Sequence, residues 1–250
     1  MATQPVTRAA LVRVGTWNVH GGIGSDGRFD LRRVATGITS MSADIWALQE
    51  VESRASRARG IDGFDVLSAA CGGHAVAART LRSDEGDFGH LLGSRWPIER
   101  ITIHDVSHRR REPRHVIEGR IAGSHQTLRV LAVHLDLSRR ARRAQIAMLR
   151  DLLDDAGHEP CVALGDFNTP RSGTPERLLA QYLHAVPSGP TFPARWPLLR
   201  LDRIWCRPHG LIRDAEVPRN FSNASDHLPV VAAIDPEHWT PRVPVAEASL

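Results

Sequence analysis

The sequence predicts a single domain of mixed α/β class over residues 10–235 of the 250-residue chain. Short apolar runs typical of strands recur along this stretch, and a few segments with helical spacing lie between them. The composition, 42% hydrophobic and 24% charged, is that of a globular protein with a sizeable core. Because the stretch holds no repeat, low-complexity block or linker, we expect one domain, followed by a proline-containing tail over 236–250.

The first half of the chain is expected to hold mainly strands. A strand beginning at Ala10 ends in the glycine-rich turn at 20–22, and the apolar spacing from Phe29 to Met41 then predicts a helix. Residues 51–62 are polar and arginine-rich, which favours a loop. The further strands expected in this half are 43–50, 64–70, 74–80, 88–94 and 98–106.

The second half begins with a predicted hairpin of strands 116–122 and 127–133, followed by a helix from Ser138 to Gly157. A buried strand over 160–164 leads into the segment Gly165-Asp-Phe-Asn168. The remaining elements expected are a short helix over 174–184, an irregular loop over 187–197, and strands over 199–205 and 211–217. Within 225–232, the Asp226-His227 pair is expected just before a last, β-branched strand.

The charged residues exclude some chemistries. All 32 basic residues are arginine, which rules out a Schiff-base lysine and a P-loop lysine and suits bidentate contact with phosphate; the net charge is +4. Three widely spaced cysteines, Cys71, Cys161 and Cys206, are expected to be reduced thiols. With no apolar leader and no run of membrane-spanning length, we expect a cytoplasmic protein, although arginines leave peripheral phospholipid contact open.

Polar residues follow the predicted strands where each strand ends, and each one alone could be an ordinary turn or surface residue. Together, without cysteine or lysine chemistry, they point to a hydrolytic site that uses a metal ion and water. Oxygen donors with few histidines suit Mg²⁺ or Mn²⁺ better than a closed zinc site. The strand-end residues are Asn18, Glu50, His134, Asp166, Asn168, Asp202, Asp226 and His227.

Six motifs, in this order and spacing, resemble those of the endonuclease/exonuclease/phosphatase superfamily, and together they span nearly the whole domain. The resemblance implies a four-layer sandwich of two packed β-sheets with helices outside, as in deoxyribonuclease I, and Mg²⁺-dependent phosphoester hydrolysis. The motifs are Thr16-Trp-Asn-Val-His20, Leu48-Gln-Glu-Val51, Val133-His-Leu135 with Arg142-x-x-Gln145, Gly165-Asp-Phe-Asn168, Leu201-Asp-Arg-Ile-Trp205 and Ser225-Asp-His-Leu-Pro229.

The resemblance also implies roles for single residues. Glu50 corresponds to the principal metal ligand, with Asn18 beside it and Asp226 completing the metal environment. Asp166 corresponds to the residue that orients or deprotonates the attacking water, and Asn168 to one that holds a phosphate oxygen.

The histidines have corresponding roles. His227 matches the histidine that contacts the scissile phosphate, paired with Asp202, which would fix its tautomer and favour the imidazolium form. His134 matches a second histidine of the deoxyribonuclease and sphingomyelinase branches. Further candidates for phosphate or substrate contact are His20, His90, Arg114 of the basic run 107–115, and Arg142.

This chain departs from the family pattern at two of these positions. Many members carry asparagine where His90 stands, and apurinic-site nucleases carry an acid where His20 stands, which weighs against a dedicated apurinic endonuclease. The leading hypothesis is a monomeric phosphodiesterase acting on nucleic acid, a lipid or a small molecule. A phosphomonoesterase, a nonenzymatic phosphate-binding protein, and a purely structural Asp202–His227 pair are the alternatives.

Overall fold

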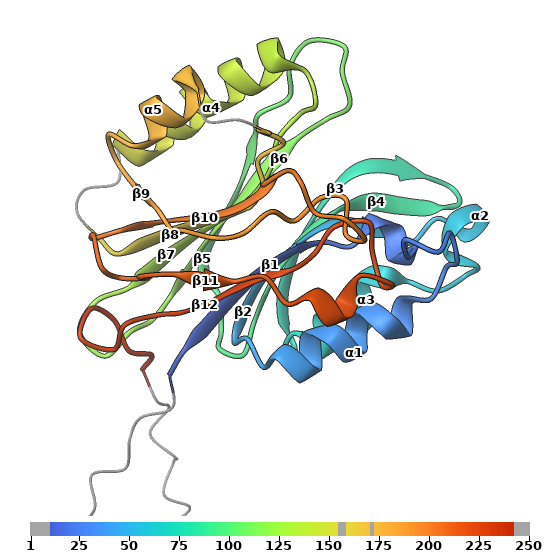
Figure 1. The fold of residues 1–250 in the computed structure, drawn as a ribbon, viewed down its shortest axis with the longest axis horizontal. Helices are drawn as coiled ribbons and strands as arrows, with labels where there is room; N and C mark the ends of the chain where they lie inside the picture. Colours follow the sequence, from blue (N-terminus) through green and yellow to red (C-terminus); the bar gives the residue numbers. More distant parts are fainter. Residues whose placement is uncertain (1–10, 155–158, 171–172, 243–250) are drawn as a thin grey trace, which may run out of the picture.

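The computed structural model describes residues 11–154, 159–170 and 173–242, which form four layers (Figure 1). Two six-stranded sheets pack face to face. Helices α1 (Leu31–Met41) and α3 (Gly63–Ala70) cover the outer face of the first sheet, and α4 (Arg139–Asp154) and α5 (Thr174–Leu179) cover that of the second. The predicted four-layer sandwich is confirmed.

Each sheet mixes parallel and antiparallel neighbours. The first sheet has the order β11 (Ala215–Glu216), β12 (Val230–Ala233), β1 (Arg13–Asn18), β2 (Ile45–Glu52), β4 (Gly86–Ser94), β3 (His74–Ser83). The second has the order β5 (Glu99–Asp105), β6 (His115–Ile121), β7 (Leu128–His134), β8 (Cys161–Asp166), β10 (Asp202–Arg207), β9 (His184–Ala185). The shorter elements are η1 (His20–Gly22), α2 (Ala55–Ala58) and η2 (Arg219–Phe221).

One parallel pair in each sheet positions the polar strand ends. In the first sheet β1 runs through α1 into β2, and in the second β7 runs through α4 into β8; both strand pairs are parallel. Since parallel neighbours end at the same edge of a sheet, each unit brings two strand ends together. The predicted helix over 29–41 and the predicted 116–133 hairpin are present as α1 and as β6 with β7.

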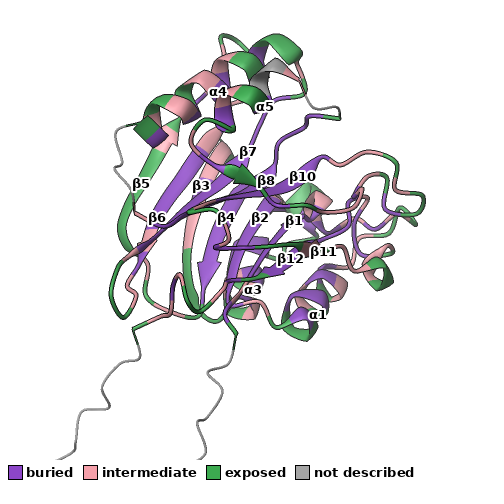
Figure 2. Ribbon diagram, turned by 60° about the vertical axis from the view of Figure 1, so that its left-hand side comes forward, coloured by how far each residue is buried: buried purple, intermediate pink, exposed green. Residues whose placement is uncertain are grey.

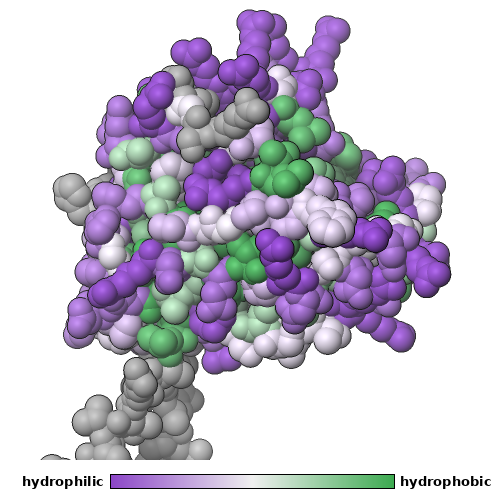
Figure 3. All heavy atoms as spheres, viewed as in Figure 1, coloured by the Kyte–Doolittle hydropathy of each residue, from purple (hydrophilic) through white to green (hydrophobic). Residues whose placement is uncertain are grey.

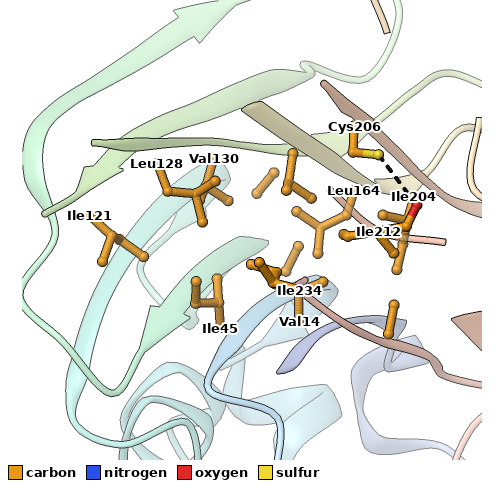
Figure 4. Close-up of a cluster of buried hydrophobic side chains, with 14 of the residues drawn as sticks. Val14, Ile45, Ile121, Leu128, Val130, Leu164, Ile204, Cys206, Ile212 and Ile234 are labelled. Carbon is orange, nitrogen blue, oxygen red and sulfur yellow. Dashed lines mark hydrogen bonds between the residues drawn. The ribbon is translucent and has the colours of Figure 1, made fainter. Parts of the chain in front are cut away.

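Alternation of side chains along the strands builds the core between the sheets. Val14, Ile45, Val130, Leu164 and Ile204 point into this inter-sheet layer (Figure 4), and the central strands are almost entirely buried (Figure 2). The intervening residues of the same strands pack against the helices outside. Because the side-chain period of a strand is two, each strand has one inter-sheet face and one helix-covered face.

Two segments have a different type of structure from the one predicted, and the predicted helix over 174–184 and strand over 211–217 are shorter, as α5 and β11. Residues 64–70 form helix α3 instead of a strand, because the Asp62 carboxylate caps the first turn by accepting from the backbone N–H groups of Phe64 and Asp65. The predicted loop over 51–62 holds the end of β2 and the short helix α2. The apolar run in 64–70 is short and fits both the helical period of 3.6 residues and the strand period of two, so the sequence pattern does not distinguish them.

The start of the tail packs onto the domain. Trp239 is buried in the inter-sheet core, its ring meets that of Trp96 edge-on with centroids 6.3 Å apart, and Pro241 bridges to Gly123. Residues 236–242 therefore continue the folded unit, whereas 243–250 and residues 155–158 of the predicted 138–157 helix lie outside the described residues. Cys71, Cys161 and Cys206 are buried free thiols, as expected. Among the described helices, none is long and apolar enough to cross a membrane.

Candidate active site

Three of the predicted residues stand in one row across the second sheet. His134 of β7 lies opposite Asp166 of β8, and Asp166 lies opposite Asp202 of β10. They continue the inter-sheet face of their strands, two residues beyond Ala132 and Leu164 and two before Ile204. Gly165 allows this close pairing, since it has φ 154° and an added Cβ would lie 1.8 Å from the carbonyl oxygen of Val133.

The first sheet contributes Asn18 and Glu50. Asn18 continues the inter-sheet face of β1, on which Val14 and Thr16 precede it. Glu50 would point to the other face by strict alternation, because Trp46 and Leu48 pack against the outer helices. A register shift in the pairing of β2 with β4, with Glu50 at φ 58°, turns this residue toward the second sheet.

Asn18 joins the two sheets. Its side-chain amide donates to Glu50 Oε1 at 2.8 Å and to Asp166 Oδ2 at 3.1 Å. His134 Nε2 lies 3.9 Å from each of these two carboxylate oxygens, beyond hydrogen-bond distance. The ends of β1, β2, β7 and β8 therefore converge on two carboxylates that share one amide donor.

Asn168 lies in the loop that follows β8. Its backbone N–H donates to Asp166 Oδ1 at 2.8 Å, and its side-chain amide donates to the carbonyl of Leu135 at 2.9 Å. The residue is buried and adopts φ 51°, a conformation that asparagine tolerates. This ties the loop after β8 to the loop after β7 and fixes the carboxylate of Asp166 between them.

His227 pairs with Asp202 as the resemblance implies. Nδ1 of His227 lies 2.8 Å from Asp202 Oδ2, and Asp202 is fully buried. The His227 ring packs on Phe192 with centroids 4.8 Å apart. The neighbouring Asp226 is half-buried, and its Oδ1 lies 3.5 Å from His20 Nδ1.

Burial and crowding make Asp166 a weak acid. Burial raises its pKa most, the negative charge of Asp202 adds to this, and His227, Asn18 and the backbone of Asn168 oppose it, so that the pKa is about 7. Burial lowers the pKa of His227, but Asp202, Asp166 and Asp226 outweigh it and raise that pKa to about 10. At neutral pH the site thus holds an imidazolium beside a carboxyl group that can exchange a proton.

His134 and His90 are neutral. Burial, followed by the charges of Arg114, His90 and His227, holds the pKa of His134 well below its usual range. Burial, with His115 and Arg114, lowers the pKa of His90 to about 3. His90 lies on β4 beside the register shift at Glu50, and its buried Nε2 has no hydrogen-bond partner.

Two arginines predicted to contact phosphate or substrate instead form hydrogen bonds within the protein. Arg142 is buried, and its Nη1 donates to the carbonyls of Asp136 and Leu137, which fixes the loop after β7. Arg114 is buried and its Nη1 bonds Glu112. His20 stays partly exposed and lines a cavity of about 40 Å³ together with Glu50, so solvent reaches the site from this side.

The sequence did not reveal the residues that support the Asp202–His227 pair. The Ser225 hydroxyl donates to the carbonyl of Asn18 at 2.7 Å and accepts from the N–H of His227 at 3.2 Å. Thr191 Oγ1 accepts from the N–H of Asp202 at 3.3 Å. Ser225 stands inside a recognised motif, but nothing in the sequence singled out Thr191 or Phe192 within their proline-rich loop.

The donor set suits a metal ion. Asp166, Asp202 and His227 each offer a ligand atom within 4.8 Å of the others, so this group could hold one. Glu50 Oε1 and Asp166 Oδ2 both lie against the amide of Asn18, and Asp202 Oδ1 is buried without a hydrogen-bond partner. Several carboxylate oxygens close together with one amide are the ligands that hard divalent cations prefer.

Comparisons with known proteins show the family of this chain. A family model described as "Endonuclease/Exonuclease/phosphatase family" matches residues 15–227. The "Uncharacterized protein YbhP" of Escherichia coli (strain K12) is 31% identical over 242 residues, covering 89% of this chain and 95% of that protein.

Solved structures share the fold at low identity. An endonuclease/exonuclease/phosphatase from Beutenbergia cavernae superposes with a TM-score of 0.73 at 21% identity, covering 94% of this chain and 73% of that one. A mannosyl-6-phosphatase of Bacteroides thetaiotaomicron superposes with a TM-score of 0.67 at 16% identity, covering 88% of this chain and 98% of that one. Truncated TDP2 of Caenorhabditis elegans superposes with a TM-score of 0.63 at 18% identity, covering 89% of this chain and 96% of that one.

Proposed function

The chain belongs to the endonuclease/exonuclease/phosphatase family, and on that premise we propose that it is a Mg²⁺- or Mn²⁺-dependent phosphodiesterase. One observation carries the proposal: Asn18, which donates to Glu50 at 2.8 Å, also donates to Asp166 of the other sheet at 3.1 Å. Likewise His227, in the loop before β12, lies 2.8 Å from Asp202 of the second sheet. Such a site combines a metal-binding carboxylate pair, a proton acceptor and a cationic hydrogen-bond donor.

The metal is best held by Glu50 and Asp166, with Asn18 beside them and Asp226 at the edge. Asp202 and His227 form a charge pair of their own, so their charges already compensate each other. Glu50 and Asp166 share only a neutral amide, which leaves their negative charge for a cation. When bound, the ion would supply Lewis-acid stabilisation of the phosphoryl oxygens.

The protein side chains position the other reactants. Asp166, which the amide of Asn18 and the backbone N–H of Asn168 hold in place, is proposed to orient the attacking water and accept its proton. His227 is held by Asp202 through Nδ1, so its Nε2–H is left to donate to an oxygen of the phosphoryl group as charge develops there. Asn168 and neutral His134 border the same space and are proposed to contact the phosphate.

The charge of the site favours a diester. A phosphomonoester carries about two negative charges at neutral pH and a diester one. Neutral His134, together with Arg142 and Arg114 bound to groups of the protein, leaves His227 as the main cationic donor among the described candidates. The alternative, a phosphomonoesterase, has support from the fold shared with a mannosyl-6-phosphatase.

The test is hydrolysis by the purified full chain with Mg²⁺ or Mn²⁺ and with EDTA. The panel is a bis-aryl phosphodiester, an aryl phosphomonoester, supercoiled plasmid, apurinic duplex and phospholipid vesicles. Metal-dependent turnover that disappears in Asp166→Ala and His227→Ala, but persists in the exposed-carboxylate control Asp151→Ala, supports the proposal. Preference for the monoester selects the alternative.

A nonenzymatic phosphate-binding protein predicts a different result. Folded wild-type protein would bind phosphate but hydrolyse no member of the panel. Phosphate binding would then be unchanged in Asp166→Ala and His227→Ala.

A further inference from the structure

Three large apolar side chains are exposed close to the site. Leu137, Trp196 and Leu198 have exposed fractions of 71%, 76% and 80%. They lie on two loops that follow or flank the strand ends of the site. Figure 3 shows hydrophobic side chains at the surface between the α4/α5 layer and the sheets below it.

The loop that carries Trp196 and Leu198 is fixed to the site at its base. The N–H of Ala194 donates to the carbonyl of Asp226 at 2.7 Å, and the Phe192 ring packs on His227. The N–H of Leu198 donates to the carbonyl of Phe192 at 2.9 Å, which closes the loop. Its base therefore holds the site residues, while its tip presents Trp196 and Leu198 to solvent.

The loop that carries Leu137 is fixed in the same way. The N–H of Leu135 donates to the carbonyl of Asp166 at 2.9 Å, and the carbonyl of Leu135 accepts from the Asn168 side chain at 2.9 Å. Arg142 holds the carbonyl of Leu137 itself. Both apolar tips are thus anchored on residues of the site, one on Asp166 and Asn168 and the other on Asp226 and His227.

Arginines accompany the apolar tips, and the acid next to Leu137, Asp136, is buried and paired with Arg111. Arg139 and Arg140 follow Leu137, Arg195 precedes Trp196, and all three are exposed. Residues 137–150 and 187–201 contain no Asp or Glu. Arg111 bonds Asp136 at 2.7 Å, which places the basic segment with exposed Arg109 and Arg110 beside the same rim.

We propose that this rim, made of Leu137, Arg139, Arg140, Arg195, Trp196 and Leu198, docks on an anionic phospholipid bilayer and presents the site to the headgroup layer. Tryptophan prefers the membrane interface, leucine the acyl boundary, and arginine the lipid phosphates. The inference rests on the proposed function, since it places the phosphoester substrate at a bilayer surface.

The aliphatic tips favour a bilayer over nucleic acid. A nucleic-acid groove gains from arginines and from aromatic rings that stack on bases, but two leucines exposed by more than two thirds gain little from bases or phosphates. Burial in the acyl region removes their apolar surface from water. Another exposed apolar pair, Ile101 and Ile103 on the edge strand β5, lies in a strand that also carries Glu99 and Asp105.

The experiment measures co-sedimentation of the full chain with vesicles of phosphatidylcholine alone or mixed with phosphatidylglycerol. We expect binding to the anionic vesicles, weakened by salt. Trp196→Ser with Leu198→Ser should lower the partition coefficient about 100-fold, because burial of each side chain contributes about a factor of ten. Arg139→Gln with Arg140→Gln should lower it about tenfold. The matched apolar control, Ile101→Ser with Ile103→Ser, should bind like the wild type.

Several results would overturn the inference: no vesicle binding by the wild type, equal loss in the β5 control, or tighter binding to single-stranded DNA that the Trp196/Leu198 variant abolishes. Turnover of a soluble bis-aryl phosphodiester separates this from the proposed function. We expect all rim variants to retain it. Hydrolysis of the soluble diester without vesicle binding would reject only the membrane-docking inference. Vesicle binding without hydrolysis of any substrate would reject the proposed function.

Discussion

Two clusters of buried charge lie on opposite faces of the second sheet and differ in how their charges balance. On the outer face, the Glu118 carboxylate accepts from Arg129 twice at 2.9 Å, from Arg120 at 2.7 Å and contacts His104 at 2.7 Å. Burial alone would raise its pKa, but Arg129, His104 and Arg120 outweigh burial and lower it to about 2. Every charge in this cluster has an opposite partner.

On the inter-sheet face, the balance is reversed. Asp166, Asp202 and Asp226 surround one imidazolium, His227, and the pKa of Asp166 is raised to about 7. Such an arrangement does not stabilise the fold, because a buried carboxylate whose charge is not compensated by a cation destabilises the folded protein. The balanced cluster stabilises the protein, whereas the unbalanced one is arranged for a cation and a reaction.

The largest expected effect is the loss of hydrolysis in Asp166→Asn. An amide cannot take a proton from water, and it offers one oxygen where the carboxylate offers two. We expect metal-dependent turnover to fall by about 10³-fold or more. Steady-state kinetics on the preferred substrate, with circular dichroism to confirm folding, checks this; turnover within tenfold of the wild type would reject the assignment.

Glu118→Gln should act on stability instead. Removing one member of a buried ion pair costs about 3–5 kcal/mol, because Arg129 loses its nearest charged partner. Urea unfolding measures the loss, and kcat should stay at the wild-type value.

The pH dependence of Glu118→Gln gives an independent check. Because the folded pKa of Glu118 is lowered from 4.5 to about 2, its contribution is present above pH 4.5 and is lost as the pH falls through about 2. The stability difference between variant and wild type should shrink over that interval. A difference that is constant with pH would mean that the charge of Glu118 is not what stabilises the cluster.

Asp202→Asn should have a smaller effect that depends on pH. Without the negative charge, the pKa of His227 falls from about 10 toward its ordinary 6.5, so the imidazolium is lost as the pH rises through that lower value. We expect activity within about tenfold of the wild type at pH 6 and about 100-fold lower at pH 8.5. A variant that fails to fold would instead support a purely structural role for the pair.

The smallest effect is expected for Phe192→Leu. The ring supports His227 at a centroid distance of 4.8 Å, and an aromatic contact of this kind contributes about 0.5–1.5 kcal/mol. Loss of this support should reduce kcat severalfold and leave the metal dependence unchanged. A pH–rate profile identical in shape to that of the wild type would show that Phe192 positions the ring and does not set its charge.

The sequence was most informative where the period of two and the motifs coincide. Val130, Ala132 and His134 show by spacing alone that the histidine continues a core face, and the structure has that arrangement. The same spacing failed for Glu50, whose side chain reaches the inter-sheet layer through a register shift and a positive φ. A local backbone irregularity of this kind has no signature in the residue pattern.

Other features depend on long-range packing. The sequence does not indicate that Asp202 lies opposite Asp166, 36 residues away, on the neighbouring strand. It also does not indicate that Arg142 donates to the carbonyls of Asp136 and Leu137. Helix α3 was missed because its apolar run is short and its cap, Asp62, is a residue equally common in turns. Tertiary contact decides such cases, and single-residue patterns do not contain it.

The contrast between the two charge clusters is tested most directly by thermal unfolding of metal-free Asp166→Asn and Glu118→Gln at about pH 8. Above its pKa of about 7, ionised Asp166 is a buried anion beside Asp202, so its replacement should leave the melting temperature equal to or above that of the wild type. Glu118→Gln should melt clearly lower. A strongly lowered melting temperature in Asp166→Asn with hydrolysis intact would contradict the account, because Asp166 would then belong to the balanced, structural kind.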